Sequence, residues 1–71
     1  MDQAKIKSFH KACLEVFTLC SDQYAKSYAR AGLSMSGDEE VRVQALYILN
    51  NLAYWRGEQA RATKAALKEF K

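Results

Sequence analysis

Apolar side chains recur at helical spacing through almost the whole of this 71-residue chain, and no proline interrupts them. Over residues 2–31 they fall within one stripe about 120° wide, as expected for a helix that packs on one side. The stripe consists of Ile6, Phe9, Cys13, Val16, Phe17, Cys20, Tyr24, Tyr28 and Ala31. The pattern predicts one long helix over 2–31, closed by a left-handed glycine at Gly32.

A second helix is predicted over residues 38–56, after a short link at 32–37 that can fold the chain back on itself. Ser36 and Glu39 have the spacing of a capping box. Negative charge on the first turn is favoured by the helix dipole, and three acidic residues stand there: Asp38, Glu39 and Glu40. We interpret this triplet as helix initiation rather than as a site for a metal or a basic partner.

The second predicted helix is apolar on nearly all sides, and such a helix is normally buried on all sides. One stripe should pack on the first helix: Val41, Ala45, Ile48, Leu49, Leu52 and Trp55. The opposite side carries Val43, Leu46, Tyr47, Asn50, Ala53 and Tyr54. One amphipathic partner helix cannot cover both sides. The uncovered side would form an apolar patch of several hundred Å², which is near the limit that monomers leave exposed. The pattern therefore predicts a homodimer.

The predicted dimer or partner interface consists of Val43, Leu46, Tyr47, Asn50 and Tyr54. Asn50 is either an ordinary exposed polar residue or a polar residue that sets the register within a helical interface. The tyrosines are either core residues whose hydroxyls reach water or interface anchors.

Gly57 divides the second helix from a third predicted helix over 58–70. A cation followed by glycine is typical of a helix end. A continuous helix through Gly57 is the alternative, because the apolar stripe is nearly in phase across it. We expect a break or sharp bend there, with Trp55 largely buried against the first helix. The predicted fold is thus all-α, a helical hairpin or three-helix arrangement forming one domain over 1–71 and assembling as a homodimeric bundle.

Two cysteines, Cys13 and Cys20, lie on the apolar stripe. In a helix they stand about 10 Å apart along the axis, too far for a disulfide, so we expect reduced, inert thiols in a reducing, cytoplasmic setting. His10 is the only histidine, and these three residues lack the spacing of a zinc site. His10 and Cys13 have the spacing of a catalytic cysteine–histidine pair, but the cysteine lies on the apolar stripe, where a free thiol is usually inert. The sequence therefore predicts no enzyme, no metal and no cofactor.

A basic stripe runs along the third predicted helix and consists of Arg61, Lys64, Lys68 and Lys71. It could follow nucleic-acid phosphates, or it could be a solvated face of a chain whose net charge is only +3. The stripe itself lacks aromatic residues for base stacking. The longest apolar run, at 45–49, is far shorter than the roughly 20 residues of a membrane span, so no membrane is expected.

These patterns favour a binding protein over an enzyme. The chain begins with methionine, and we expect a free-standing small protein that dimerises and modulates a larger protein partner. We base this expectation on the small helical regulators and inhibitors that phages and mobile elements use against host machinery. The alternative is a small nucleic-acid-binding protein that uses the basic stripe.

Overall fold

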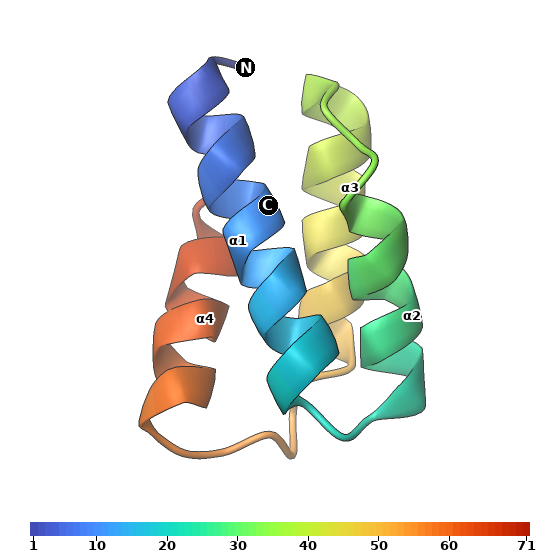
Figure 1. The fold of residues 1–71 in the computed structure, drawn as a ribbon, viewed down its shortest axis with the longest axis vertical. Coiled ribbons are helices and arrows are strands. Elements are labelled where there is room, and N and C mark those ends of the chain that lie inside the picture. The colour runs from blue at the N-terminus through green and yellow to red at the C-terminus, as the bar shows by residue number, and fades with distance from the viewer.

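The computed structural model describes all residues, 1–71, and contains four α-helices and no strand. In chain order they are α1 (Gln3–Leu19), α2 (Gln23–Gly32), α3 (Asp38–Asn50) and α4 (Glu58–Lys68). The helices run alternately down and up in Figure 1. α1 and α3 each pack against both α2 and α4, so the four form a bundle. The all-α prediction is confirmed, but the hairpin or three-helix expectation is wrong.

The first predicted helix is two helices, because the chain turns at residues 20–22. Cys20 adopts an extended conformation, with φ −85° and ψ 144°. Asp22 then caps α2, and its carboxylate accepts a hydrogen bond of 2.9 Å from the Ala25 N–H. Aspartate is among the best N-capping residues, and this bond satisfies one of the free N–H groups at the start of the helix. The predicted continuous helix over 2–31 is therefore wrong.

α2 buries small residues instead of the large ones expected in the core. Its buried residues are Ala25, Ala29 and Gly32, whereas Tyr24 is 71% exposed and Tyr28 is 37% exposed. Gly32 is the last residue of α2 and does not have a positive φ, so its predicted left-handed role is wrong.

Gly32 allows α2 to approach α1 closely. A Cβ at this position would lie 2.8 Å from the Cys13 Sγ and 3.2 Å from the Phe9 Cζ. The two backbones can approach this closely only because position 32 has no side chain.

α3 begins at Asp38, as predicted, but the cap lies one residue later than expected. Gly37 is the N-cap residue, and the Glu40 carboxylate accepts hydrogen bonds from the N–H groups of Gly37 and Ser36, at 2.9 and 3.1 Å. These two bonds lower the pKa of Glu40 because they stabilise its charged form. The predicted capping box at Ser36 and Glu39 is therefore wrong. Glu40 makes the carboxylate half of a capping box instead, with Gly37 as the N-cap residue.

α3 ends at Asn50, so the predicted helix over 38–56 is too long. The Asn51 side chain donates to the Tyr47 carbonyl at 2.9 Å, and this bond satisfies a carbonyl that the helix end leaves free. The chain continues through a link at residues 51–57, in which Leu52 is buried and Trp55 is only partly buried. The expectation that Trp55 is largely buried is thus not met.

The break at Gly57 is confirmed. Gly57 has φ 111° and ψ 175° and is the N-cap residue of α4. Only glycine readily adopts this combination of angles. α4 ends at Lys68 rather than at residue 70.

The core draws large side chains from every part of the bundle except α2. The largest buried apolar ones are Phe9, Val16, Val41, Ile48, Leu52 and Leu67. The Phe9 and Phe70 rings meet edge to face, with centroids 5.5 Å apart, and so join α1 to the end of the chain. Buried Thr63 donates to the Glu15 carboxylate at 2.9 Å, which ties α4 to α1.

We expect Gly57→Ala to lower the free energy of unfolding by about 1–3 kcal/mol, the usual cost of holding a side-chain-bearing residue in this backbone region. Nothing lies within 4 Å of an added Cβ, so the cost arises from the backbone and not from a collision. Urea denaturation measures the difference. A chain synthesised with D-alanine at position 57 is the matched control and should keep wild-type stability, because D-residues favour positive φ. Equal losses in both chains would contradict the explanation.

We expect Gly32→Ala to destabilise the protein by about 1–3 kcal/mol, the usual cost of overpacking a core, because the new methyl group collides with the Cys13 sulfur. Cys13→Ala in the same chain removes that sulfur and should recover part of the loss. Denaturation of the wild type, both single variants and the double variant forms a mutant cycle. Simple additivity of the two losses would argue against the contact.

Candidate interaction surfaces

The outer surface of α2 and α3 carries five large apolar side chains that remain solvent-exposed. We call this surface the tyrosine face, and it consists of Tyr24, Tyr28, Val43, Leu46 and Tyr47. Tyr24 is the most exposed of them at 71%, and the other four lie between 37% and 47%. The rings of Tyr28 and Tyr47 pack together across the two helices, with centroids 5.6 Å apart. The surface is therefore continuous from α2 to α3.

The core contacts of α3 determine which of its residues face outward. Val41, Ala45 and Ile48 are fully buried, and residues about half a helical turn away must point to solvent. Gln44, at the edge of the buried side, donates through its Nε2 to the Tyr28 carbonyl at 2.7 Å. This bond holds α2 beside α3 and so fixes Tyr28 next to Tyr47.

The predicted interface residues divide among three places. Val43, Leu46 and Tyr47 lie on the tyrosine face, and Asn50 is exposed at the end of α3. Tyr54 is not on α3 but in the link that follows it, where it is 92% exposed.

The apolar stripe of the sequence predicted Tyr24 and Tyr28 on the buried side of a helix, whereas both lie on the exposed tyrosine face. The signal that could have shown it is the row of small residues Ala25, Ala29 and Gly32, at helical spacing on another side of the same segment.

The predicted basic stripe also divides. Arg61, Lys68 and Lys71 are exposed, whereas Lys64 is partly buried and donates through its Nζ to the Trp55 carbonyl at 2.6 Å. Arg61 and Lys64 line a hollow of about 340 Å³ together with residues of the link: Ala53, Trp55, Arg56 and Gly57. Arg56, the cation that precedes Gly57 and is not part of the predicted stripe, thus joins two cations of the stripe.

His10 and Cys13 both take part in internal contacts. The His10 Nε2 lies 2.7 Å from the Met35 carbonyl oxygen, so this nitrogen donates to the backbone of the α2–α3 link. Both cysteines are buried and free. Burial raises the pKa of the Cys13 thiol to about 12, so the sulfur is protonated at neutral pH, whereas a nucleophilic cysteine reacts as the thiolate.

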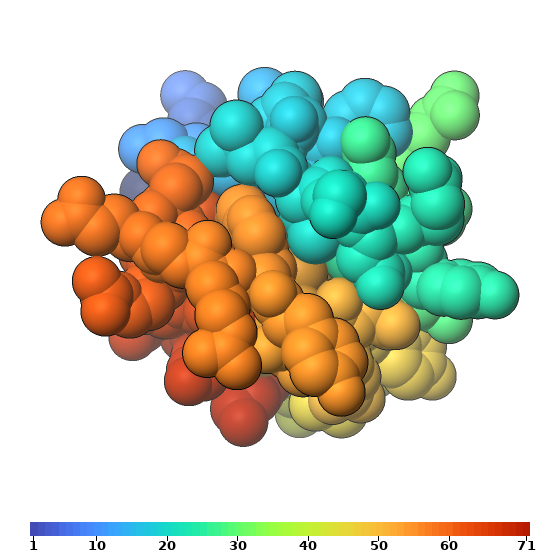
Figure 2. Space-filling model, turned by 90° about the horizontal axis from the view of Figure 1, so that it is seen from below, coloured from blue at the N-terminus to red at the C-terminus, as the bar shows by residue number.

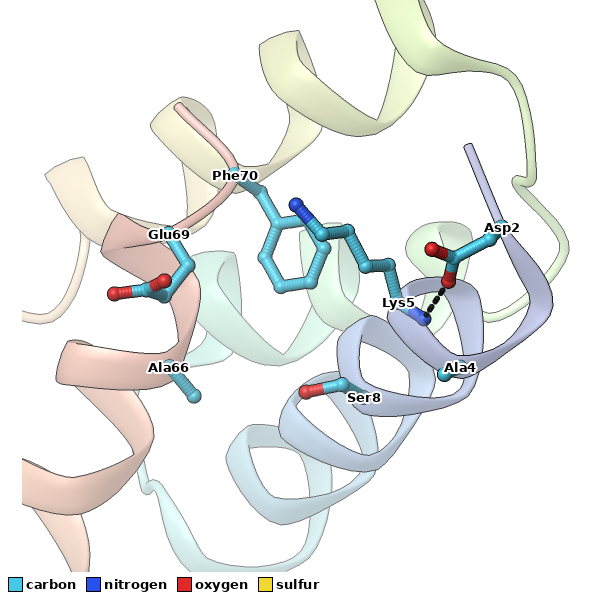
Figure 3. A pocket seen from close by; sticks show the side chains of 7 residues that line it. All are labelled: Asp2, Ala4, Lys5, Ser8, Ala66, Glu69 and Phe70. Atoms are coloured by element: carbon cyan, nitrogen blue, oxygen red, sulfur yellow. Dashed lines mark hydrogen bonds between the residues drawn. The ribbon is translucent and has the colours of Figure 1, made fainter.

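The largest hollow of the molecule, about 360 Å³, lies between the start of α1 and the end of the chain. Figure 3 shows Lys5 and Ser8 on one side of it and Ala66, Glu69 and Phe70 on the other. The Asp2 carboxylate caps α1 by accepting the Lys5 N–H at 2.9 Å. No group of three or more histidine, cysteine, aspartate or glutamate side chains is placed to hold a metal ion.

The fold and these surfaces define a small four-helix bundle with an exposed apolar face on α2 and α3 and a hollow lined by three cations. None of its helices has the length and apolar character needed to cross a membrane. Comparison of the chain with protein families, with curated protein sequences and with solved structures gives no match.

We expect stability to fall between pH 9 and pH 12 in part because of Cys13. Its thiol has an ordinary pKa of 9.0 and a pKa of about 12 when folded, so in this range the unfolded chain releases a proton that the folded chain retains. The stabilisation is therefore complete below pH 9 and is lost as the pH rises toward 12. Denaturation of Cys13→Ala should show a shallower alkaline decline. An alkaline decline equally steep in Cys13→Ala and in the wild type would contradict this explanation.

Proposed function

We propose that this protein is a non-enzymatic binding protein that pairs with a second copy of itself through the tyrosine face. The observation that carries the proposal is the exposed surface of five large apolar side chains on α2 and α3, joined by the contact between the Tyr28 and Tyr47 rings. Tyrosine is favoured at interfaces because it combines a large apolar area with a polar tip.

The size of the tyrosine face supports a dimer. The exposed fractions of its three tyrosines together equal about one and a half complete tyrosine side chains. This corresponds to roughly 220–380 Å² of exposed surface, at about 150–250 Å² per aromatic residue. Val43 and Leu46 add to this area. A standard interface buries about 800 Å² per partner, of which a little over half is apolar. The face therefore supplies most of the apolar area that one partner of such a dimer needs.

The charge distribution also favours a second copy as the occupant. A two-fold dimer places the same patch of each subunit against the other, so a charged patch would oppose like charges. The chain carries a net charge of +3, but none of the five residues of the tyrosine face is charged. The neighbouring Arg42 lies 3.9 Å from Glu39 on the same helix, so its charge is partly offset.

We further propose that the dimer docks on a larger protein through α1, since pairing at the tyrosine face leaves a second apolar group free. Leu14 and Phe17 are exposed one turn apart on α1, and the Lys26 ammonium lies 5.8 Å from the centre of the Phe17 ring. This combination of apolar and cationic groups suits a partner surface that carries apolar side chains beside carboxylates. The internal hydrogen bond of His10 and the protonated Cys13 support a binding role over a catalytic one.

Sedimentation equilibrium at micromolar concentration should give twice the mass of one chain. Tyr47→Lys should raise the dimer dissociation constant by about tenfold or more, because a buried, unpaired charge costs more than about 1.4 kcal/mol. Tyr54→Lys makes the same exchange outside the face and should leave the dimer intact. A monomeric wild type, or equal effects of the two variants, would refute the proposed dimer. The docking on α1 is tested by capture of a partner protein. The capture should survive nuclease treatment and should be lost with Phe17→Lys.

A further inference from the structure

Tyr54 is the most exposed of the large apolar side chains, yet its backbone is firmly held. Leu52 is buried, and the Trp55 N–H donates to the Leu52 carbonyl at 3.1 Å. The Lys64 ammonium fixes the Trp55 carbonyl at 2.6 Å. The ring of Tyr54 therefore extends into solvent, 92% exposed, from a well-ordered turn. It contributes almost nothing to the core, so packing gives no reason for an aromatic residue at this position.

Three cations surround this turn. Arg56, Arg61 and Lys64 line the hollow of about 340 Å³ that includes Trp55, the residue after Tyr54. Neither arginine forms an ion pair, since the two salt bridges of the molecule involve other residues. From residue 53 to residue 64 the only acidic residue is Glu58. This hollow is therefore positively charged and has two arginines without ionic partners. Asp22 of the α1–α2 link lies with Tyr54 on a second hollow, of about 190 Å³, which shares Trp55 with the first.

Figure 2 views the molecule from the end of the bundle that carries the α3–α4 link. The orange residues of the α3–α4 link and the start of α4 project beside the teal link between α1 and α2. Tyr54 lies between Ala53 and Trp55 in the chain, and both of these residues line the hollow with the cations. The basic stripe lacked an aromatic residue when considered as sequence, and the fold supplies one from the preceding link.

We infer that this end of the bundle binds single-stranded nucleic acid, with Tyr54 stacking on a base and Arg56, Arg61 and Lys64 contacting phosphates. A positively charged groove beside an exposed aromatic ring is the combination by which proteins hold single strands without regard to sequence. Bases of a duplex are stacked on each other, so only an unpaired base offers its face to Tyr54. Lys68 lies farther along α4, about 10 Å from Arg61 along the axis, and extends the charged path.

This site is separate from the tyrosine face, so it does not depend on the proposed dimer. The guanidinium groups are suited to phosphate because they present several donors in a plane. An acidic protein surface would also attract the cations, but it would not require an exposed aromatic ring. Tyr54 therefore distinguishes the two kinds of partner.

The test is fluorescence anisotropy of a labelled fifteen-nucleotide deoxythymidine strand, titrated with the full chain at low salt. Binding should occur and should weaken as salt rises, because phosphate contacts release counterions. Tyr54→Leu should weaken binding at least about fivefold, the equivalent of about 1 kcal/mol of stacking. Tyr54→Phe keeps the aromatic ring and should bind as the wild type does. Since Tyr54 is almost fully exposed, neither variant should disturb the fold, which circular dichroism checks.

The charges are tested with Arg56→Gln together with Arg61→Gln, which should weaken binding and flatten its salt dependence. Lys5→Gln together with Lys7→Gln is the matched control, since it removes two exposed cations from the start of α1, and it should have little effect. Failure to bind the strand would overturn the inference. Binding of a duplex of the same length with the same affinity as the single strand would also overturn it, as would equal binding of the strand by the wild type and Tyr54→Leu. A third contrary result is displacement of the strand by an acidic peptide that has the same affinity for the wild type and for Tyr54→Leu.

Discussion

The close approach of α2 to α1 at Gly32 is the contact on which the rest of the bundle depends. A side chain at this position would meet the Cys13 sulfur at 2.8 Å, and the other two buried residues of α2 are alanines. Backbones this close leave no room for Tyr24 or Tyr28 between the helices. Both tyrosines therefore lie on the outside, although each contains more apolar surface than the residues that replace it in the core.

The position of α2 then determines how α3 is covered. The Gln44 amide reaches the Tyr28 carbonyl because α2 lies directly alongside, and the buried side of α3 is filled by contacts with its neighbours in the bundle. No fifth helix lies on the outer side. A helix that is apolar on nearly all sides is thus covered on only one of them, and its outer residues join the two displaced tyrosines in one surface. The tyrosine face is therefore a consequence of the small buried residues of α2, which lie at the contact between α1 and α2.

Sequence periodicity revealed the fold class, the start of α3 at Asp38 and the break at Gly57, because caps and glycines act locally. It failed at residues 20–24, where Cys20 and Tyr24 continue the apolar stripe in phase and concealed the Asp22 cap. Hydrophobicity weights tyrosine above alanine, whereas close helix packing selects the smaller side chain. Which stripe of α2 is buried depends on Phe9 and Cys13 of α1, and a single segment contains no information about such a distant contact.

The cationic group likewise has a different composition in the folded chain from that of the basic stripe in the sequence. Arg61 and Lys64 are one turn apart on α4 and are recognised together from sequence, but Arg56 joins them in one hollow only because Gly57 turns the chain sharply. Lys64 both contributes charge and fixes the link through the Trp55 carbonyl. The turn that exposes Tyr54 is thus held by a residue of the cationic group itself. The fold and the proposed single-strand site therefore share this lysine, while the tyrosine face depends on a different pair of helices, so the two surfaces can be altered one at a time.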